Sequence, residues 1–319
     1  MRSRMNLSLI TLGDDVVEIV IDPTHGADVL TLRHRSSGVD VLFATPWRRH
    51  ADEVIAGIRN PTTADPVGGY VERYRGGWNT LCPNAGPPRT VHGAPVGFHG
   101  EVVTARWNVV HTTAESAQLR LALFSVPVVI HREIRVEDGG VVVDDEVHNM
   151  SDVALDIDYV SHPAFGGRFI EGDVRIDTNA RAFNADPATY GGPIDAGTTV
   201  AWPGTTSGVD LRSVPGEPRS VFGWLSEFDG RPWAMVTNRD LGLAVRVTWD
   251  GEHLPYAWFW QELSSTEGFP WHRRARALAI EPASTPTSGP GRARTLHLEP
   301  RQCVSLRVAV CLIETEEIP

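Results

Sequence analysis

Short runs in which hydrophobic and polar residues alternate cover most of the chain, and turn residues such as Asp138-Gly139-Gly140 separate them. A period of two residues is that of a half-buried β-strand, and no long stretch follows the 3.6-residue period of a helix. Many short strands joined by polar turns predict a β-sandwich or a barrel, so we expect an all-β protein. The clearest alternating runs are 16–21, 27–32, 39–43, 118–125, 128–136, 141–147, 243–249 and 256–260.

Three stretches lack this alternation. Residues 44–75 contain prolines, glycines and a basic cluster, and they predict a long loop with one short helix near residues 52–58. Residues 183–220 and 283–295 are rich in turn-forming residues and predict loops, with short strands in the first of them. No linker divides the chain, so we expect a single domain over residues 1–319.

Composition narrows the range of partners. The net charge of −11 disfavours nucleic acid and anionic membranes, and no apolar run approaches the ~20 residues of a membrane span. All 29 basic residues are arginine, which excludes a lysine Schiff base or a P-loop lysine. The three cysteines have no metal-site spacing, and without an apolar N-terminal leader they favour a reducing, cytoplasmic setting. The oligomeric state stays open.

The segment 155–167 combines a strand pattern with a titratable side chain. Apolar and polar residues alternate up to Tyr159, and His162 follows directly before Pro163. Proline has no N–H, so we expect the strand to stop near His162. A histidine at the end of a rigid strand suits a proton donor or acceptor near neutral pH. The alternative is a structural histidine that caps the strand.

Glu281 repeats this arrangement, because it ends the apolar run 277–280 and stands directly before Pro282. A carboxylate buried beside an apolar strand has a raised pKa and suits a general base at neutral pH. The alternative is a solvated glutamate at a strand end.

Two His-Gly pairs, His92-Gly93 and His99-Gly100, follow Asn84 in a glycine-rich region. We expect their side chains to project from a sheet edge, either toward a ligand or simply into solvent. No third ligand stands beside them at a metal-site spacing, so we expect no metal.

Aromatic residues gather late in the chain, where six of the ten tryptophans lie between residues 224 and 271. Tyr256, Trp258 and Trp260 share one face of the predicted strand, and Gln261 lies on the other. Such a stripe stacks on the C–H faces of sugars or, more commonly, forms core.

These pieces occur in an order that resembles the aldose 1-epimerase (galactose mutarotase-like) family, from about residue 10 to residue 312. The resemblance rests on the order and spacing of several short motifs. They read here Pro83-Asn84, His99-Gly100, Asn149-Met150-Ser151, His162-Pro163-Ala164-Phe165 and Glu281-Pro282.

The resemblance implies a large antiparallel β-sandwich with a cleft on one sheet. It also implies an aldose 1-epimerase that interconverts the anomers of a small sugar without a cofactor. In that reading His162 is the general acid, Glu281 is the general base and His99 binds the sugar, with His92 as the alternative. The further candidates for sugar binding are Asn84, Arg75, Trp260 and Gln261.

Two positions depart from the family pattern. Ala85 stands where other members have a sugar-binding arginine, and Arg75 or Arg73 is a candidate substitute. No motif identifies the substrate-binding aspartate, for which Asp229 and Asp240 are candidates. These departures keep open a non-catalytic sugar-binding or sensing protein that uses the same cleft. A hydrolase or lyase is a third alternative, although glycoside hydrolysis usually needs two carboxylates and the sequence offers one convincing candidate.

Overall fold

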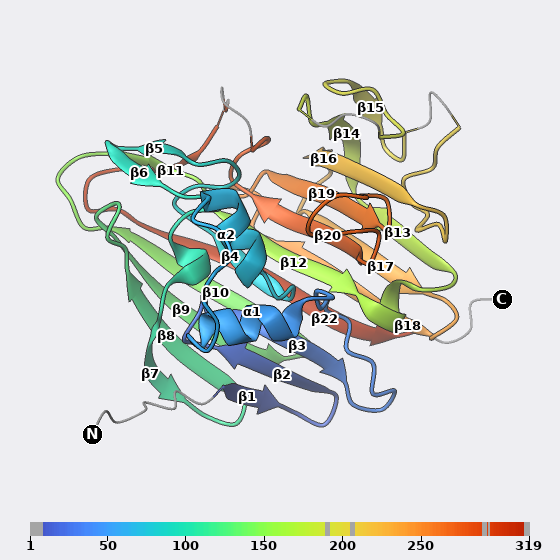
Figure 1. The fold of residues 1–319 in the computed structure, drawn as a ribbon, viewed down its shortest axis with the longest axis horizontal. Coiled ribbons are helices and arrows are strands. Elements are labelled where there is room, and N and C mark those ends of the chain that lie inside the picture. Colours follow the sequence, from blue (N-terminus) through green and yellow to red (C-terminus); the bar gives the residue numbers. More distant parts are fainter. Residues whose placement is uncertain (1–8, 189–191, 205–207, 289–291, 293, 316–319) are drawn as a thin grey trace.

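Two large antiparallel sheets stacked face to face make up most of the protein (Figure 1). Strands account for 48% of the structure and helices for 8%, so the predicted all-β antiparallel sandwich is confirmed. The computed structural model describes residues 9–188, 192–204, 208–288, 292 and 294–315. The extreme N-terminus, used above to argue against a leader, and parts of the two turn-rich stretches lie outside the described residues.

The first sheet has ten strands, and β12 from the middle of the chain lies between the N-terminal strands β1–β4 and the later strand β20. In spatial order they are β1 (Ile10–Gly13), β2 (Val17–Asp22), β3 (Asp28–His34), β4 (Trp78–Leu81), β12 (Val160–Gly166), β20 (Arg276–Ala283), β19 (Tyr256–Leu263), β16 (Arg219–Phe228), β14 (Ala180–Ala185) and β15 (Thr199–Ala201).

The second sheet has eight strands, and two short two-stranded sheets complete the described β-structure. The eight strands are β13 (Val174–Thr178), β17 (Trp233–Asn238), β18 (Leu243–Trp249), β22 (Cys303–Glu314), β10 (Gly140–Asn149), β9 (Val128–Glu137), β8 (Ser116–Ala122) and β7 (Asn108–Thr112). The short pairs are β5 (Arg89–Val91) with β6 (Ala94–Val96), and β11 (Leu155–Ile157) with β21 (Leu296–Leu298).

The main core fills the space between the two sheets. Alternate residues of each strand face inward, so Ile19 and Phe165 of the first sheet and Ile134 and Val310 of the second belong to one cluster and are fully buried. The outer face of the ten-stranded sheet carries two smaller apolar clusters. Helices α1 (Arg48–Ile55) and α2 (Pro66–Arg73) lie over this outer face (Figure 1).

Local structure differs from the sequence prediction in two places. The helix expected near 52–58 is α1, which begins earlier, and α2 occupies part of the predicted loop because Asp65 caps it, accepting from the Gly68 N–H at 2.7 Å. The run 39–43 forms isolated bridges rather than the predicted strand. Among the described residues, no helix is long and apolar enough to span a membrane.

A buried polar network joins the two sheets. The Arg132 guanidinium on β9 donates to both carboxylate oxygens of Asp145 on β10, at 2.8 and 2.6 Å, and to the Thr80 hydroxyl on β4 at 2.7 Å. Tyr159 donates its hydroxyl to the same carboxylate at 2.7 Å, and the Trp107 ring lies 4.6 Å from the guanidinium carbon. Because every charge here has a partner, the network ties β4 to the opposite sheet without leaving a buried ion uncompensated.

We expect Asp145→Asn to lower the free energy of unfolding by about 3–5 kcal/mol, because it leaves the Arg132 guanidinium buried without a counter-charge. Urea-induced unfolding at neutral pH measures this loss. Asp144→Asn is the matched control: Asp144 lies on the same strand, but its ion pair with Arg135 is partly exposed, so the expected loss is at most about 1 kcal/mol. Equal losses in the two variants would contradict the structural role of the network.

Candidate active site

His162 and Glu281 lie opposite each other on the two central strands of the ten-stranded sheet. The register that pairs Val160 with Ala283 and Ala164 with Ala279 brings His162 of β12 against Glu281 of β20. The next strand, β19, places Trp258 directly beside Glu281. The three side chains therefore form one row on the outer face of the sheet.

The β12–β20 ladder is interrupted at this row. Register pairs are present at Val160 and again from Ala164 onward, but not over residues 161–163, whereas the pairing of β12 with β4 is continuous from 160 to 163. Pro163 and Pro282 supply no N–H to the interrupted stretch. The prediction that the strand stops near His162 is wrong, because β12 continues to Gly166. At Pro163 the strand loses its pairing with β20 but keeps its pairing with β4.

The two side chains touch and have few other partners. His162 Nε2 lies 3.5 Å from Glu281 Oε1, and the side chains are 9% and 2% exposed. Among the described residues, neither His162 Nδ1 nor Glu281 Oε2 has a hydrogen-bond partner. Burial lowers the pKa of His162 from 6.5 to about 4 and raises the pKa of Glu281 well above its ordinary value. Burial therefore favours the uncharged form of both groups.

His99 approaches the same site from the loop after β6. Its ring Nδ1 accepts from the Gly86 backbone N–H at 3.0 Å, and the His99 backbone N–H donates to the Gly86 carbonyl at 3.0 Å. Burial, and then the nearby His162, lower the pKa of His99 well below its ordinary value. A neutral imidazole that accepts at Nδ1 carries its proton on Nε2, so His99 can offer an N–H to a ligand.

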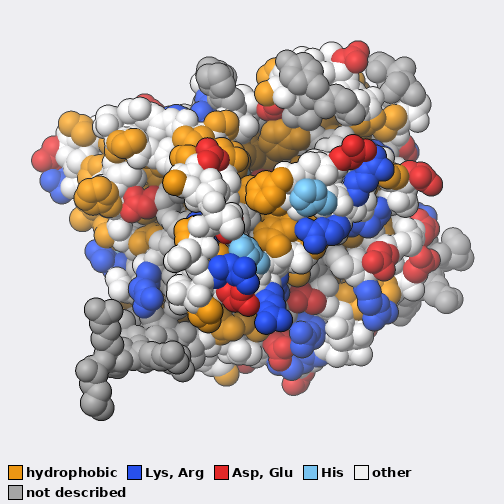
Figure 2. Space-filling view, in the orientation of Figure 1, with side chains coloured by type: hydrophobic (Ala, Val, Ile, Leu, Met, Phe, Trp, Pro, Cys, Tyr) orange, Lys and Arg blue, Asp and Glu red, His pale blue; other side chains and the backbone are white. Residues whose placement is uncertain are grey.

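Aromatic side chains wall a cavity of about 440 Å³ around these groups. Tyr70 comes from α2 and Tyr74 follows that helix, Trp260 comes from β19, and Trp271 packs against Trp260 with ring centroids 5.5 Å apart. Figure 2 shows hydrophobic side chains gathered in the hollow between the α2 region and the β14–β16 end of the sheet. These walls surround the His162–Glu281 pair with largely apolar side chains.

Small residues lie next to the His162–Glu281 pair on the same face of the sheet. Ala164 and Ala279 occupy the next row of β12 and β20, and both are fully buried. Their methyl groups leave room for the rings of Tyr74 and Trp260, which belong to or pack against the same cluster. The Tyr74 hydroxyl is buried and has no hydrogen-bond partner among the described residues, so it is a donor available to a ligand in the cavity.

Comparison with protein families matches residues 9–305 to the family described as Domain of unknown function (DUF4432). The chain belongs to this family. None of the curated proteins compared with it matches.

Several solved structures share the fold of this DUF4432 protein. The Slr1438 protein from Synechocystis sp. PCC 6803 is 16% identical with a TM-score of 0.70, and the comparison covers 96% of each chain. The galactose mutarotase related enzyme from Lactobacillus acidophilus is 15% identical (TM-score 0.67; 98% of this chain, 100% of that one). A galactose mutarotase-like protein from Lactobacillus casei ATCC 334 is 14% identical (TM-score 0.65; 96% and 100%). The predicted resemblance is therefore supported at the level of the fold.

The predicted sugar-binding residues divide into two groups. His99 and Trp260 line the cavity with His162 and Glu281. Asn84, Arg75, Gln261 and His92 do not belong to its lining, and each has a different environment.

Arg75 and Asn84 are committed to other buried partners. Arg75 is 4% exposed and pairs with Asp22 at 2.8 Å and Asp28 at 3.6 Å, so it does not replace the missing sugar-binding arginine. The Asn84 amide donates to the Pro87 and Gly97 carbonyls, both at 3.0 Å, and shapes the loop behind the cavity wall.

Gln261 and His92 face away from the cavity. Gln261 points into the core on the opposite face from Trp260, and its side-chain oxygen accepts from Arg219 at 2.8 Å. His92 is exposed and accepts the Asp156 N–H at 2.8 Å.

The other proposed substitutes, Arg73, Asp229 and Asp240, are also absent from the described lining. Arg73 donates to the Gly69 carbonyl at 2.7 Å, and Asp240 accepts the Asp173 N–H at 2.9 Å.

Sequence reasoning missed several lining residues, among them Tyr70, Tyr74, Trp271 and Glu262. The tyrosines lie in or next to a helix inside a predicted loop, where no periodic pattern marks them. Glu262 is on the Trp260 face of β19, so its position could have been read from the alternation. Its carboxylate accepts from the Ser265 and Thr266 N–H groups at 2.7 and 3.0 Å and from the Thr266 hydroxyl at 2.5 Å.

We expect His162 to remain neutral down to about pH 4, because burial disfavours its charged form. Histidine-ring NMR titration measures this. The internal control is His297, whose pKa is raised by its hydrogen bond to Asp156. The unfolded chain takes up the His162 proton at the ordinary pKa of 6.5, so this residue also lowers stability as pH falls from 6.5 toward 4. A His162 midpoint near 6.5 would contradict the buried environment.

Proposed function

We propose that the protein interconverts the α and β anomers of an uncharged aldose by general acid–base catalysis. The observation that carries the proposal is the His162–Glu281 pair, in which two titratable groups 3.5 Å apart line one aromatic cavity. Opening a sugar ring needs one group that takes the proton of the C1 hydroxyl and another that protonates the ring oxygen. A well-placed acid or base typically contributes about 10²–10⁴-fold, so this pair is sufficient without a cofactor.

The proton count of the pair suits a reversible reaction. A neutral imidazole with a protonated carboxyl holds as many protons as an imidazolium with a carboxylate. In the first form His162 takes the C1 hydroxyl proton while Glu281 protonates the ring oxygen as the C1–O5 bond breaks. That turnover produces the second form, and rotation about C1–C2 followed by closure with reversed roles restores the first. Starting from the second form, Glu281 is the base and His162 the acid, as the family resemblance implies.

The charge of the cavity favours an uncharged sugar. Its described lining includes the carboxyl groups of Glu262 and Glu281 but no arginine, and the chain has no lysine. A sugar phosphate would need a cation there, and arginine is the residue best suited to hold it. Neutral hydroxyls can instead accept from His99 and Tyr74, while the apolar ring faces stack on Trp260 and Trp271.

We expect Glu281→Gln and His162→Asn each to lower the anomerisation rate by roughly 10²-fold or more, because each removes one titrating group while keeping a side chain of similar size. NMR or polarimetry on a panel of free and phosphorylated aldoses measures the rate, and the two losses should not add fully because the groups act as a unit. His92→Asn is the matched control: it removes an exposed histidine outside the cavity and should leave the rate unchanged. Full activity in Glu281→Gln would overturn the acid–base assignment.

We expect Tyr74→Phe to reduce kcat/KM by roughly tenfold, because it removes one hydrogen bond to the sugar. The melting temperature should stay the same or rise, since the hydroxyl has no partner among the described residues. Tyr159→Phe is the counterpart: its hydroxyl donates to Asp145 at 2.7 Å, so that variant should lose stability and keep its affinity for sugar. If Tyr74→Phe lost stability but not activity, its hydroxyl would have a structural role.

A second candidate function is non-catalytic sugar binding in the same cavity. It is favoured by Ala85 at the position of the usual sugar-binding arginine and by the pairing of Arg75 with Asp22 and Asp28. A parent protein that binds an aldose, detected by quenching of its tryptophan fluorescence, yet never exceeds the buffer-catalysed rate would decide for this function.

A further inference from the structure

A group of metal-binding side chain types lies on the outer face of the eight-stranded sheet, on the opposite side of the sandwich from the cavity. It comprises His131 on β9, Glu146 and His148 on β10, and Cys303 on β22. The register places Glu146 directly opposite His131, and His148 directly opposite Cys303. Cross-strand neighbours on one face lie close enough to share a ligand.

Three of these side chains converge on one point. His148 Nε2 lies 3.4 Å from the Cys303 sulfur and 3.4 Å from Glu146 Oε2, and all three donor atoms lie within 4.8 Å of one another. Bond lengths of about 2.3 Å to sulfur and 2.0–2.2 Å to nitrogen and oxygen give donor separations of about 3.4–3.6 Å in a tetrahedral zinc site. Two of the three separations already match that geometry.

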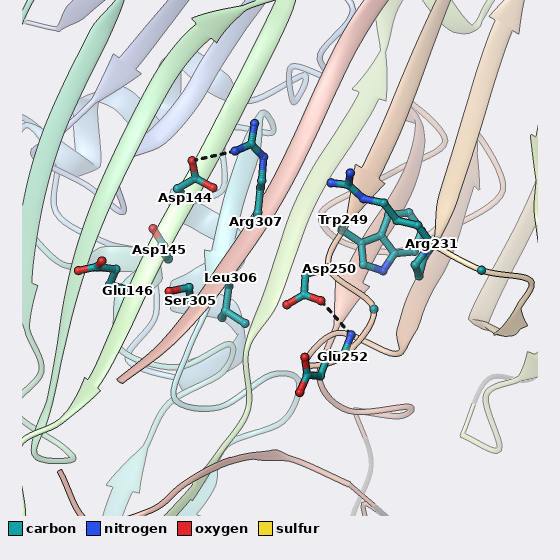
Figure 3. A pocket seen from close by; sticks show the side chains of 13 residues that line it. Asp144, Asp145, Glu146, Arg231, Trp249, Asp250, Glu252, Ser305, Leu306 and Arg307 are labelled. Carbon is teal, nitrogen blue, oxygen red and sulfur yellow. Dashed lines mark hydrogen bonds and ion pairs between the residues drawn. The ribbon is translucent and has the colours of Figure 1, made fainter. Parts of the chain in front are cut away.

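Glu146 differs from its neighbour on the strand in having no competing cation. Asp144 is held by Arg135 at 2.7 Å and Arg307 at 3.6 Å, whereas Glu146 pairs with no arginine among the described residues. Asp144, Glu146, Ser305 and Arg307 line a depression of about 780 Å³. Figure 3 shows the Asp144–Arg307 ion pair, with Glu146 further along the same strand. The Glu146 carboxylate is therefore accessible and uncommitted except to His148.

We propose that Glu146, His148 and Cys303 form a surface site for a divalent transition-metal ion such as Zn²⁺. Thiolate, imidazole and carboxylate together are the donor types that zinc prefers, and they are too soft a set for calcium or magnesium. His131, whose ring centroid lies 5.3 Å from that of His148, or a solvent molecule completes the coordination. An ion bound there would link β10 to β22, and through His131 to β9.

Sequence spacing could not reveal this group, because its members lie on different strands. Glu146 and His148 alternate on one strand, but Cys303 is 155 residues away from His148. We predicted no metal because the sequence lacks a local metal-binding motif. That prediction could not take account of ligands on separate strands that only the sheet register brings together.

The test is titration of the full-length protein with Co²⁺, which gives a thiolate-to-cobalt charge-transfer band when a cysteine is a ligand. We expect one equivalent to bind, with Zn²⁺ displacing it, and Cys303→Ser to abolish the band. Cys311→Ser is the matched control, since Cys311 lies further along β22 and belongs to no such donor group in the described part of the chain. His148→Ala should weaken binding at least tenfold, as the loss of a direct ligand does.

The melting temperature provides a second readout that does not depend on any enzymatic activity. Zn²⁺ should raise it in the parent and in Cys311→Ser but not in Cys303→Ser, because a ligand stabilises only the form that binds it. The Cys303 side chain is exposed, so equal melting temperatures without metal will show that the variant folds. A charge-transfer band that survives in Cys303→Ser, or that disappears in Cys311→Ser, would overturn the proposal.

Discussion

Two prolines in the centre of the ten-stranded sheet prevent β12 and β20 from pairing along their whole length, and the candidate site depends on this constraint. A central strand normally has its backbone groups satisfied on both sides. Here Pro163 and Pro282 supply no donor, and the register pairs vanish over residues 161–163. The continuous pairing of β12 with β4 keeps the strand in place. His162 and Glu281 therefore lie opposite each other on paired strands, but at a point where the backbone pairing between β12 and β20 is interrupted.

The two faces of the same strands have opposite polar character. On the inner face Trp78 donates to Ser161 at 2.7 Å, and Thr80 accepts from Arg132 at 2.7 Å. On the outer face, partners are missing among the described residues for a polar atom of Asn79, Tyr74, His162 and Glu281. Buried polar atoms without partners destabilise a fold. Three of these residues, Tyr74, His162 and Glu281, line one cavity, which is typical of a site that a ligand completes. The satisfied inner network offsets this by holding β4 and the start of β12 against the opposite sheet.

The alternation pattern predicted an all-β sandwich or barrel, whereas the antiparallel sandwich with a cleft and the acid–base roles of His162 and Glu281 were implied only by the family resemblance. Alternation determines which elements form, and a titratable residue directly before a proline marked both His162 and Glu281. Arg75 could not be assigned in this way, because its acidic partners are about 50 residues away and no local feature reveals that they neutralise it. Alternation along β19 already placed Gln261 on the opposite face from Trp260, and in the structure this face points into the core rather than toward the cavity. The tyrosines that wall the cavity depend on where α2 packs, which is a tertiary property.

No arginine belongs to the described lining of the cavity, and this limits the ligands that the cavity can recognise. Arginine side chains are still close: Arg89 and Arg292 lie behind the same loop, each 3.0 Å from the Asp158 carboxylate. That carboxylate is fully buried and pairs with both guanidinium groups, and neither arginine belongs to the described lining of the cavity. What reaches the cavity instead is a neutral imidazole, a phenol and aromatic faces. Groups of this kind can hydrogen-bond to hydroxyls and pack on C–H surfaces. Neither they nor the carboxyl groups of Glu262 and Glu281 offer a counter-charge to a phosphate, so the described lining favours an uncharged ligand.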